Sequence, residues 1–77
     1  MEKQIFNRIK GALADTGVSN KELAEHLGMR EHTVSRWCTN DQQPSVRDLF
    51  RIADFLQINV KDLLVPNKLS SPSSNKA

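Results

Sequence analysis

The chain has 77 residues, a formal net charge of +2 and 38% hydrophobic residues, which is the size and composition of one small globular domain. Its single cysteine, Cys38, excludes an internal disulfide framework and favours a reducing compartment. No apolar run is long enough to span a bilayer, and the first residues lack the pattern of a signal peptide, so we expect a cytoplasmic protein.

The positive charge is concentrated at the C-terminal end. Residues 1–65 carry nine basic and nine acidic side chains, and the surplus comes from Lys68 and Lys76. Net charge therefore gives no argument for a nucleic-acid partner, and only the placement of individual charges can.

The first predicted element is a helix over about residues 4–15. Ile5, Ile9 and Leu13 recur at intervals of four, which places them on one helical face. Gly17 is a natural end for this helix because glycine adopts the left-handed conformation without a steric cost.

A second helix is predicted from Asn20 to His26 or Leu27. Ser19 and Glu22 have the spacing of a capping box, in which each side chain bonds the backbone amide of the other. Gly28 ends this helix.

A third helix begins near Arg30 or Glu31 and continues to about Thr39. Val34 and Trp37 supply its buried side, and Asn40 is expected to end it in the left-handed conformation.

A fourth helix follows, with Ser45 as its cap and an inner stripe of Leu49, Ile52, Ala53 and Leu56. A fifth, short helix is expected to begin at Asn59, with inward-facing Val60, Leu63 and Leu64. No strand pattern is evident, so the predicted class is all-α. The remaining segment, residues 66–77, is rich in Ser, Pro and Asn, and we expect it to be disordered.

Two phenylalanines of the fourth helix have more than one interpretation. Phe50 and Phe55 could both widen the core. Alternatively, an apolar dimer surface could include Phe55, Val60, Leu64 and Val65.

The second and third helices, joined by about four residues including a glycine, make a helix-turn-helix. Val34 and Trp37 are sufficient as anchors, which leaves a polar face and an exposed leading end on the third helix. Such a helix fits the major groove of DNA, where base edges present distinct donors and acceptors.

These residues resemble the phage-repressor and Cro type of helix-turn-helix, the XRE family. The similarity covers about residues 5–65 and rests on S-x-x-E-L-A, L-G, T-V-S-R-W, P-S and L-x-x-I-A-x-x-L occurring in order. It implies a compact five-helix, lambda-repressor-like domain that binds a palindromic operator as a homodimer. It also implies a transcriptional regulator, most often a repressor.

The resemblance implies contacts to double-stranded DNA at particular positions. Those corresponding to base contacts are Glu31, His32 and Arg36, flanked by Thr33 and Ser35. Those corresponding to phosphate contacts are Asn20, Thr39, Gln42 and Gln43. Arg30 stands where a Ser or Thr cap is common and is a further phosphate candidate, as is Arg47 near the start of the fourth helix.

Other interpretations of these residues remain. Arg36 can bond guanine O6 and N7, or it can be a solvated helix charge. Glu31 can contact a base, or it can be an acid that favours the helix dipole.

At the level of function, a protein-interaction module that docks an antagonist or serves as an adaptor is the rival hypothesis. His26, His32 and Cys38 match no zinc spacing, and no catalytic set stands out, so we expect no metal, no cofactor and no enzymatic activity.

Overall fold

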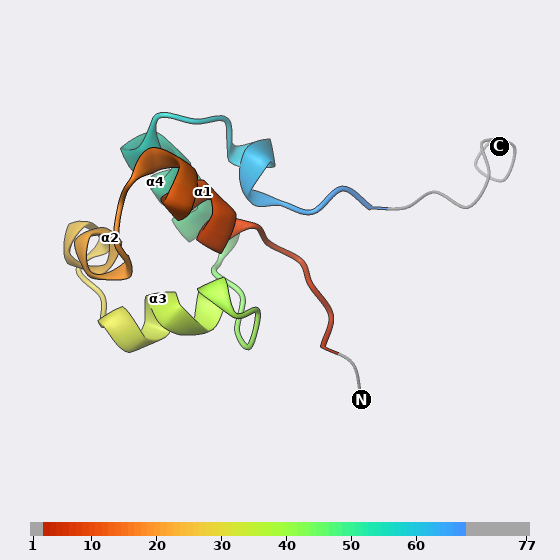
Figure 1. Cartoon of the computed structure of the whole chain (residues 1–77), viewed down its shortest axis with the longest axis horizontal. Coiled ribbons are helices and arrows are strands. Elements are labelled where there is room, and N and C mark those ends of the chain that lie inside the picture. The colour runs from red at the N-terminus through yellow and green to blue at the C-terminus, as the bar shows by residue number, and fades with distance from the viewer. Residues whose placement is uncertain (1–2, 68–77) are drawn as a thin grey trace, which may run out of the picture.

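The computed structural model describes residues 3–67. This part of the chain contains four α-helices and one 3-10 helix, namely α1 (Ile9–Thr16), α2 (Asn20–Leu27), α3 (Glu31–Cys38), α4 (Val46–Leu56) and η1 (Val60–Leu63) (Figure 1). The predicted all-α class is confirmed. The expected count of five α-helices is wrong, because the last element is a four-residue 3-10 helix. Of the segment expected to be disordered, residues 68–77 lie outside the described residues.

The helix boundaries follow from local capping. The Ser19 hydroxyl accepts a hydrogen bond from the Glu22 amide at 3.0 Å, and the Glu22 carboxylate accepts one from the Ser19 amide at 2.8 Å, so the predicted capping box is confirmed. Ser45 caps α4 through one such bond, its hydroxyl accepting from the Asp48 amide at 3.0 Å. Gly28 ends α2 with a φ of 70°, as its sequence position predicted.

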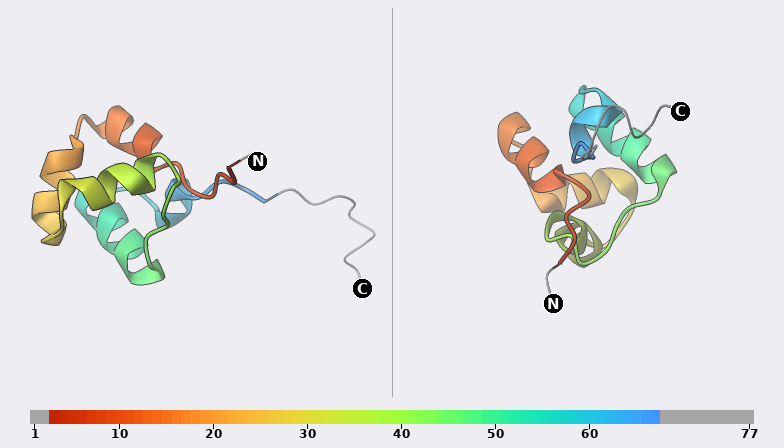
Figure 2. Two further views of the ribbon diagram at one scale, coloured as in Figure 1. Left: turned by 90° about the horizontal axis from the view of Figure 1, so that it is seen from below. Right: turned by 90° about the vertical axis from the view of Figure 1, so that its right-hand side faces the viewer.

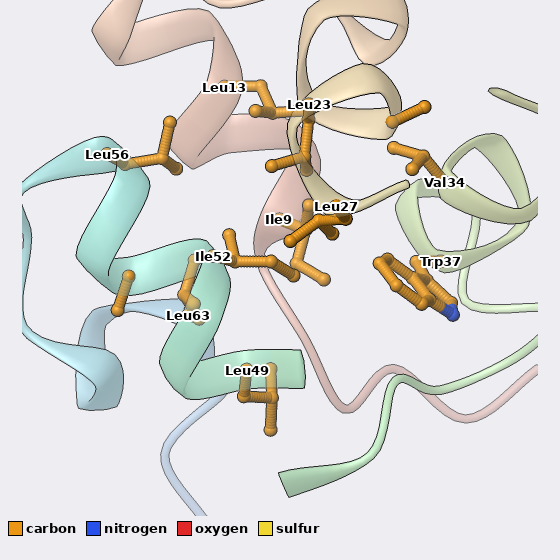
Figure 3. Close-up of a cluster of buried hydrophobic side chains, with 12 residues drawn as sticks. Ile9, Leu13, Leu23, Leu27, Val34, Trp37, Leu49, Ile52, Leu56 and Leu63 are labelled. Carbon is orange, nitrogen blue, oxygen red and sulfur yellow. The ribbon is translucent and has the colours of Figure 1, made fainter. Parts of the chain in front are cut away.

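A single apolar core lies between the helices (Figure 3). Val34 and Trp37 point into it from α3, with 0% and 3% of their surface exposed. The whole core consists of Ile9, Leu13, Leu23, Ala24, Leu27, Val34, Trp37, Leu49, Ile52, Ala53, Leu56 and Leu63. These are the inward faces that the helical periodicity predicted.

Three expectations about core packing are wrong. Ile5 was predicted on the same inner face as Ile9 and Leu13, but 51% of its surface is exposed. Phe50 does not widen the core, because 58% of its surface is exposed. Leu64 follows η1 in extended conformation and is 42% exposed, so it does not point inward.

The expected start of the first helix is also wrong, because residues 3–8 are not helical and α1 begins at Ile9. The Asn7 side chain accepts a hydrogen bond from the Ile9 amide at 3.0 Å, which starts the helix there. The preceding segment pairs with the segment after η1 in an antiparallel bridge between Asn7 and Leu64. The two segments therefore lie side by side at one end of the molecule (Figure 2).

Candidate nucleic-acid interface

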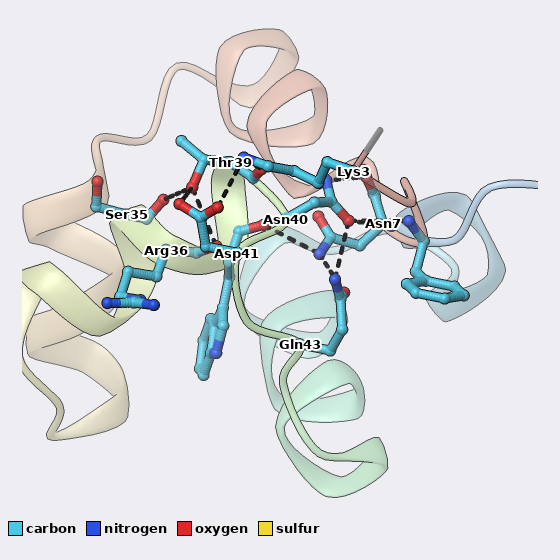
Figure 4. A network of polar contacts seen from close by, with 10 residues as sticks. Lys3, Asn7, Ser35, Arg36, Thr39, Asn40, Asp41 and Gln43 are labelled. Atoms are coloured by element: carbon cyan, nitrogen blue, oxygen red, sulfur yellow. Dashed lines mark hydrogen bonds and ion pairs between the residues drawn. The ribbon is translucent and has the colours of Figure 1, made fainter. Parts of the chain in front are cut away.

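Helix α3 presents a polar face to solvent. Glu31, His32 and Arg36 are exposed, and Thr33 and Ser35 are half-buried. Because Val34 and Trp37 anchor the opposite face, the five residues predicted to contact bases share the outer side of one fixed helix. The Arg36 guanidinium extends outward, away from Lys3 and Asn7 (Figure 4).

The N-terminal end of α3 is open. Arg30 occupies the cap position, its backbone is extended, and its side chain makes no capping hydrogen bond. The first amides of an α-helix have no acceptor within the helix, so this end can receive a phosphate oxygen. Arg30 is exposed at the same end and brings a positive charge to it.

The turn before α3 is held by neighbouring elements. The Met29 amide donates to the Ala24 carbonyl at 2.9 Å, which closes the end of α2 around Gly28. Arg51 of α4 donates to the Leu27 carbonyl at 3.2 Å, a role that the sequence did not reveal. The angle between α2 and α3 is thus supported from both the turn and α4.

The C-terminal end of α3 is closed by a polar network (Figure 4). Asn40, with a φ of 61°, accepts hydrogen bonds from the amides of Phe6 and Asn7 at 2.9 and 3.0 Å. The buried Asn7 side chain donates to the Trp37 carbonyl at 3.0 Å and to Gln43 at 2.7 Å. The N-terminal segment therefore holds the end of the helix through side-chain amides.

A charged pair completes this network on the surface. Lys3 Nζ lies 2.7 Å from a carboxylate oxygen of Asp41 and donates to the Thr39 carbonyl at 2.8 Å. The Thr39 hydroxyl donates to the other Asp41 oxygen at 2.8 Å. The hydrogen bond from Lys3, and then that from Thr39, hold the pKa of Asp41 below its ordinary value.

Three predicted phosphate-contacting residues lie around this network. Gln43 donates to Asn40 at 3.1 Å and accepts from Asn7, so both of its polar atoms have partners within the chain. The Thr39 hydroxyl is shared with Asp41, whereas Gln42 is exposed. A phosphate contact by Gln43 or Thr39 would compete with these hydrogen bonds.

Asn20 lies at the start of α2 and contacts α3. Its side-chain oxygen accepts a weak hydrogen bond from the Cys38 thiol at 3.5 Å. Burial raises the pKa of that thiol, which keeps it protonated and able to donate. This contact orients the Asn20 amide nitrogen, the group suited to a phosphate. Arg47 is exposed on the first turn of α4.

The residues predicted for a dimer surface fall into two groups. Phe55 and Val60 are half-buried against the core, and the Phe55 ring stacks on His26 with 4.0 Å between ring centroids. Leu64 and Val65 are instead exposed, beside Phe6 of the paired segment. Sequence reasoning missed Phe6 because it placed that residue in a helix.

Within residues 3–67, no group of three or more His, Cys, Asp or Glu side chains could hold a metal ion. None of the helices in that range has the length and apolarity needed to cross a membrane.

The fold and the exposed α3 define a helix-turn-helix domain. Residues 8–68 match the model of the Cro/C1-type helix-turn-helix DNA-binding domain, and the chain belongs to this family. A comparison with curated proteins gives no match.

Two solved structures are similar to this chain. One is a candidate DNA-binding protein from Bacteroides fragilis, 40% identical, with a TM-score of 0.78 over 80% of this chain and 100% of that one. The other is a transcriptional regulator from Listeria innocua, 20% identical, with a TM-score of 0.67 over 87% of this chain and 64% of that one. The second similarity supports the fold alone.

Proposed function

We propose that this protein is a sequence-specific transcriptional regulator that acts as a repressor and binds a palindromic operator as a homodimer. The observation that carries the proposal is the orientation of α3, whose apolar residues are buried while His32 and Arg36 face solvent. In a family of DNA-binding domains, such a helix suits the major groove.

In this proposal, α3 reads the sequence and its surroundings fix the register. Arg36 donates to guanine, His32 and Glu31 contact neighbouring base edges, and Thr33 and Ser35 lie beside them. Phosphates are held by the open end of α3 and by side chains around it, namely Asn20, Arg30, Thr39, Gln42, Gln43 and Arg47.

A homodimer follows from the small charge of the domain. Residues 1–65 carry equal numbers of acidic and basic side chains, so one domain gains little from counterion release. Two domains on half-sites about 34 Å apart add their contacts and double the sequence that is read. Occupancy of such an operator would repress transcription by excluding RNA polymerase.

The direct test is selection of bound duplexes from a random DNA pool, followed by quantitative gel shifts. We expect a palindromic consensus, and we expect Arg36→Ala to weaken binding by about 1–3 kcal/mol per half-site and to relax the preference at one base pair. Lys61→Ala is the matched control, because it removes an equal charge from an exposed position on η1.

Two outcomes would contradict the proposal. The first is a pool without enrichment, and the second is an Arg36→Ala variant that selects the same consensus with unchanged affinity. The first would favour an interaction module that binds a protein antagonist, for which the balanced charge of the domain and the acidic Glu31 are suited. The second would remove Arg36 from the residues that read the bases.

A further inference from the structure

The two paired terminal segments form an apolar surface on the outside of the molecule. Ile5, Phe6 and Val65 are 51%, 52% and 36% exposed and line one groove, and we call these three residues the terminal apolar patch. Residues from both segments line a groove of about 380 Å³, comprising Gln4, Ile5, Phe6, Val65, Pro66 and Asn67. Exposed apolar side chains gathered in this way are typical of an interaction surface.

The backbone holds this patch in place. The Val65 amide donates to the Phe6 carbonyl at 2.9 Å, and the Arg8 amide donates to the Leu63 carbonyl at 2.8 Å. On its other side, the Phe6 amide donates to the Asn40 side chain. The patch therefore exists before any partner binds, so association costs little ordering entropy.

We propose that the terminal apolar patch is the surface through which two copies of this chain associate. This inference rests on the dimer in the proposed function and assigns its interface. It keeps Val65 from the expected surface, adds Ile5 and Phe6, and leaves out Leu64, which does not line the groove, and the half-buried Phe55, which contacts His26.

Charge favours a second copy as the occupant. None of the six residues that line the groove is ionisable, and the neighbouring Lys3 is paired with Asp41. Two identical grooves related by a two-fold axis therefore meet without repulsion between the residues that line them. A charged partner such as DNA would find no counter-charge in the groove.

The free edge of the paired terminal segments favours association through side chains and not through backbone hydrogen bonds. Val65 uses its amide to pair with Phe6, and the next residue, Pro66, has no amide hydrogen to offer on the opposite edge. Addition of a strand from a second copy is thus disfavoured at Pro66. The aromatic ring and the methyl groups of the patch are therefore the groups that contact the second copy.

The patch is also fixed relative to the DNA-reading helix. Phe6 belongs to the patch, while the amides of Phe6 and Asn7 are bonded to Asn40 at the end of α3. A two-fold contact at the patch therefore sets the separation and direction of two α3 helices, which is what a palindromic site requires.

A second exposed apolar pair lies on α4 and serves as the comparison. Val46 and Phe50 are 70% and 58% exposed, but the hollow beside Phe50 is lined by Arg47, Arg51 and Asp54. A copy docking there would have to bury charges. Phe50 is thus a matched control for Phe6, with the same side chain and similar exposure.

The proposed interface is small. Stable interfaces bury about 800 Å² per partner, and three partly exposed side chains provide less than that. We therefore expect a dissociation constant in the range of about 10 μM to 1 mM without DNA, and two-fold pairing on an operator that supplies both half-sites.

The test uses the full chain without DNA. In an NMR sample at about 1 mM, mixing isotope-labelled and unlabelled protein should give intermolecular NOEs between the Phe6 ring of one copy and the Ile5 or Val65 methyl groups of the other. In sedimentation equilibrium, Phe6→Ser should weaken association at least about tenfold, and Phe50→Ser should leave it unchanged.

Further measurements distinguish a loss of association from a loss of folding and from a loss of DNA binding. Thermal unfolding shows whether both variants are folded. If Phe6→Ser does not fold, Val65→Thr tests the same patch with a side chain of nearly the same volume as valine. A chain that stays monomeric at about 1 mM, or NOEs that fall on Val46 and Phe50, would overturn the assignment. Because no DNA is present in this test, a negative result would not contradict sequence-specific DNA binding. In the same way, a failed DNA selection would not contradict this interface.

Discussion

The two ends of α3 are built in opposite ways. At the N-terminal end, Arg30 leaves the first amides uncapped and exposed. At the C-terminal end, Asn7 and Asn40 satisfy the backbone and tie it to another part of the chain. The difference shows how a short helix can be held rigidly at one end while the other end remains free for a ligand.

The largest effect is expected from removing the buried amide at the closed end. Asn7→Ala leaves the Ile9 amide without its partner and removes one of the two hydrogen bonds to the Trp37 carbonyl, and we expect a loss of about 2–4 kcal/mol in the free energy of unfolding. Urea unfolding measures it. Asn67→Ala is the control, because that asparagine is exposed. Equal stability of the two variants would show that the network does not hold the helix.

This closed end is the part of the candidate site that could not be predicted from the sequence. Its hydrogen bonds join residues 30 to 36 positions apart, such as Asn7 and Trp37 or Asn7 and Gln43. Periodicity reports only neighbours along a helix, and for that reason it extended the first helix back through Ile5. The antiparallel bridge between Asn7 and Leu64 overrode that local preference.

Features set by neighbouring residues were predictable. The capping box of Ser19 and Glu22 needs only a spacing of three, and the left-handed Asn40 follows from its tolerance of that conformation. The polar face of α3 followed from the two anchors Val34 and Trp37. In contrast, Gln57 ends α4 in the left-handed conformation with a φ of 59°, and no turn signal in the sequence predicted this.

A smaller effect, of opposite sign, is expected at the open end. Arg30→Ser supplies a side chain that can accept a hydrogen bond from the first turn of α3, and we expect a gain of about 0.5–1 kcal/mol in stability. The same change removes a positive charge from the proposed phosphate site, so operator affinity should fall and its salt dependence should become shallower.

Thermal unfolding and gel shifts at two salt concentrations measure this pair of effects. Ser19→Ala, which removes an existing cap from α2, is the reference for what one cap contributes. A variant that becomes more stable and binds DNA as well as before would show that the missing cap has no connection with DNA.

The smallest effect is expected from the surface pair at the closed end. Hydrogen bonds from Lys3 and Thr39 depress the pKa of Asp41 in the folded protein. The carboxylate therefore contributes stability above its ordinary pKa of 3.8, and this contribution is lost as pH falls through the lower pKa of the folded state. The stability difference between the wild type and Asp41→Asn should accordingly be largest near pH 6 and shrink below pH 4. Because Asp41 is fully exposed, high salt should shrink it as well. A difference that is independent of both pH and salt would show that the charge of Asp41 does not stabilise the closed end of α3, which would then depend on uncharged hydrogen bonds alone.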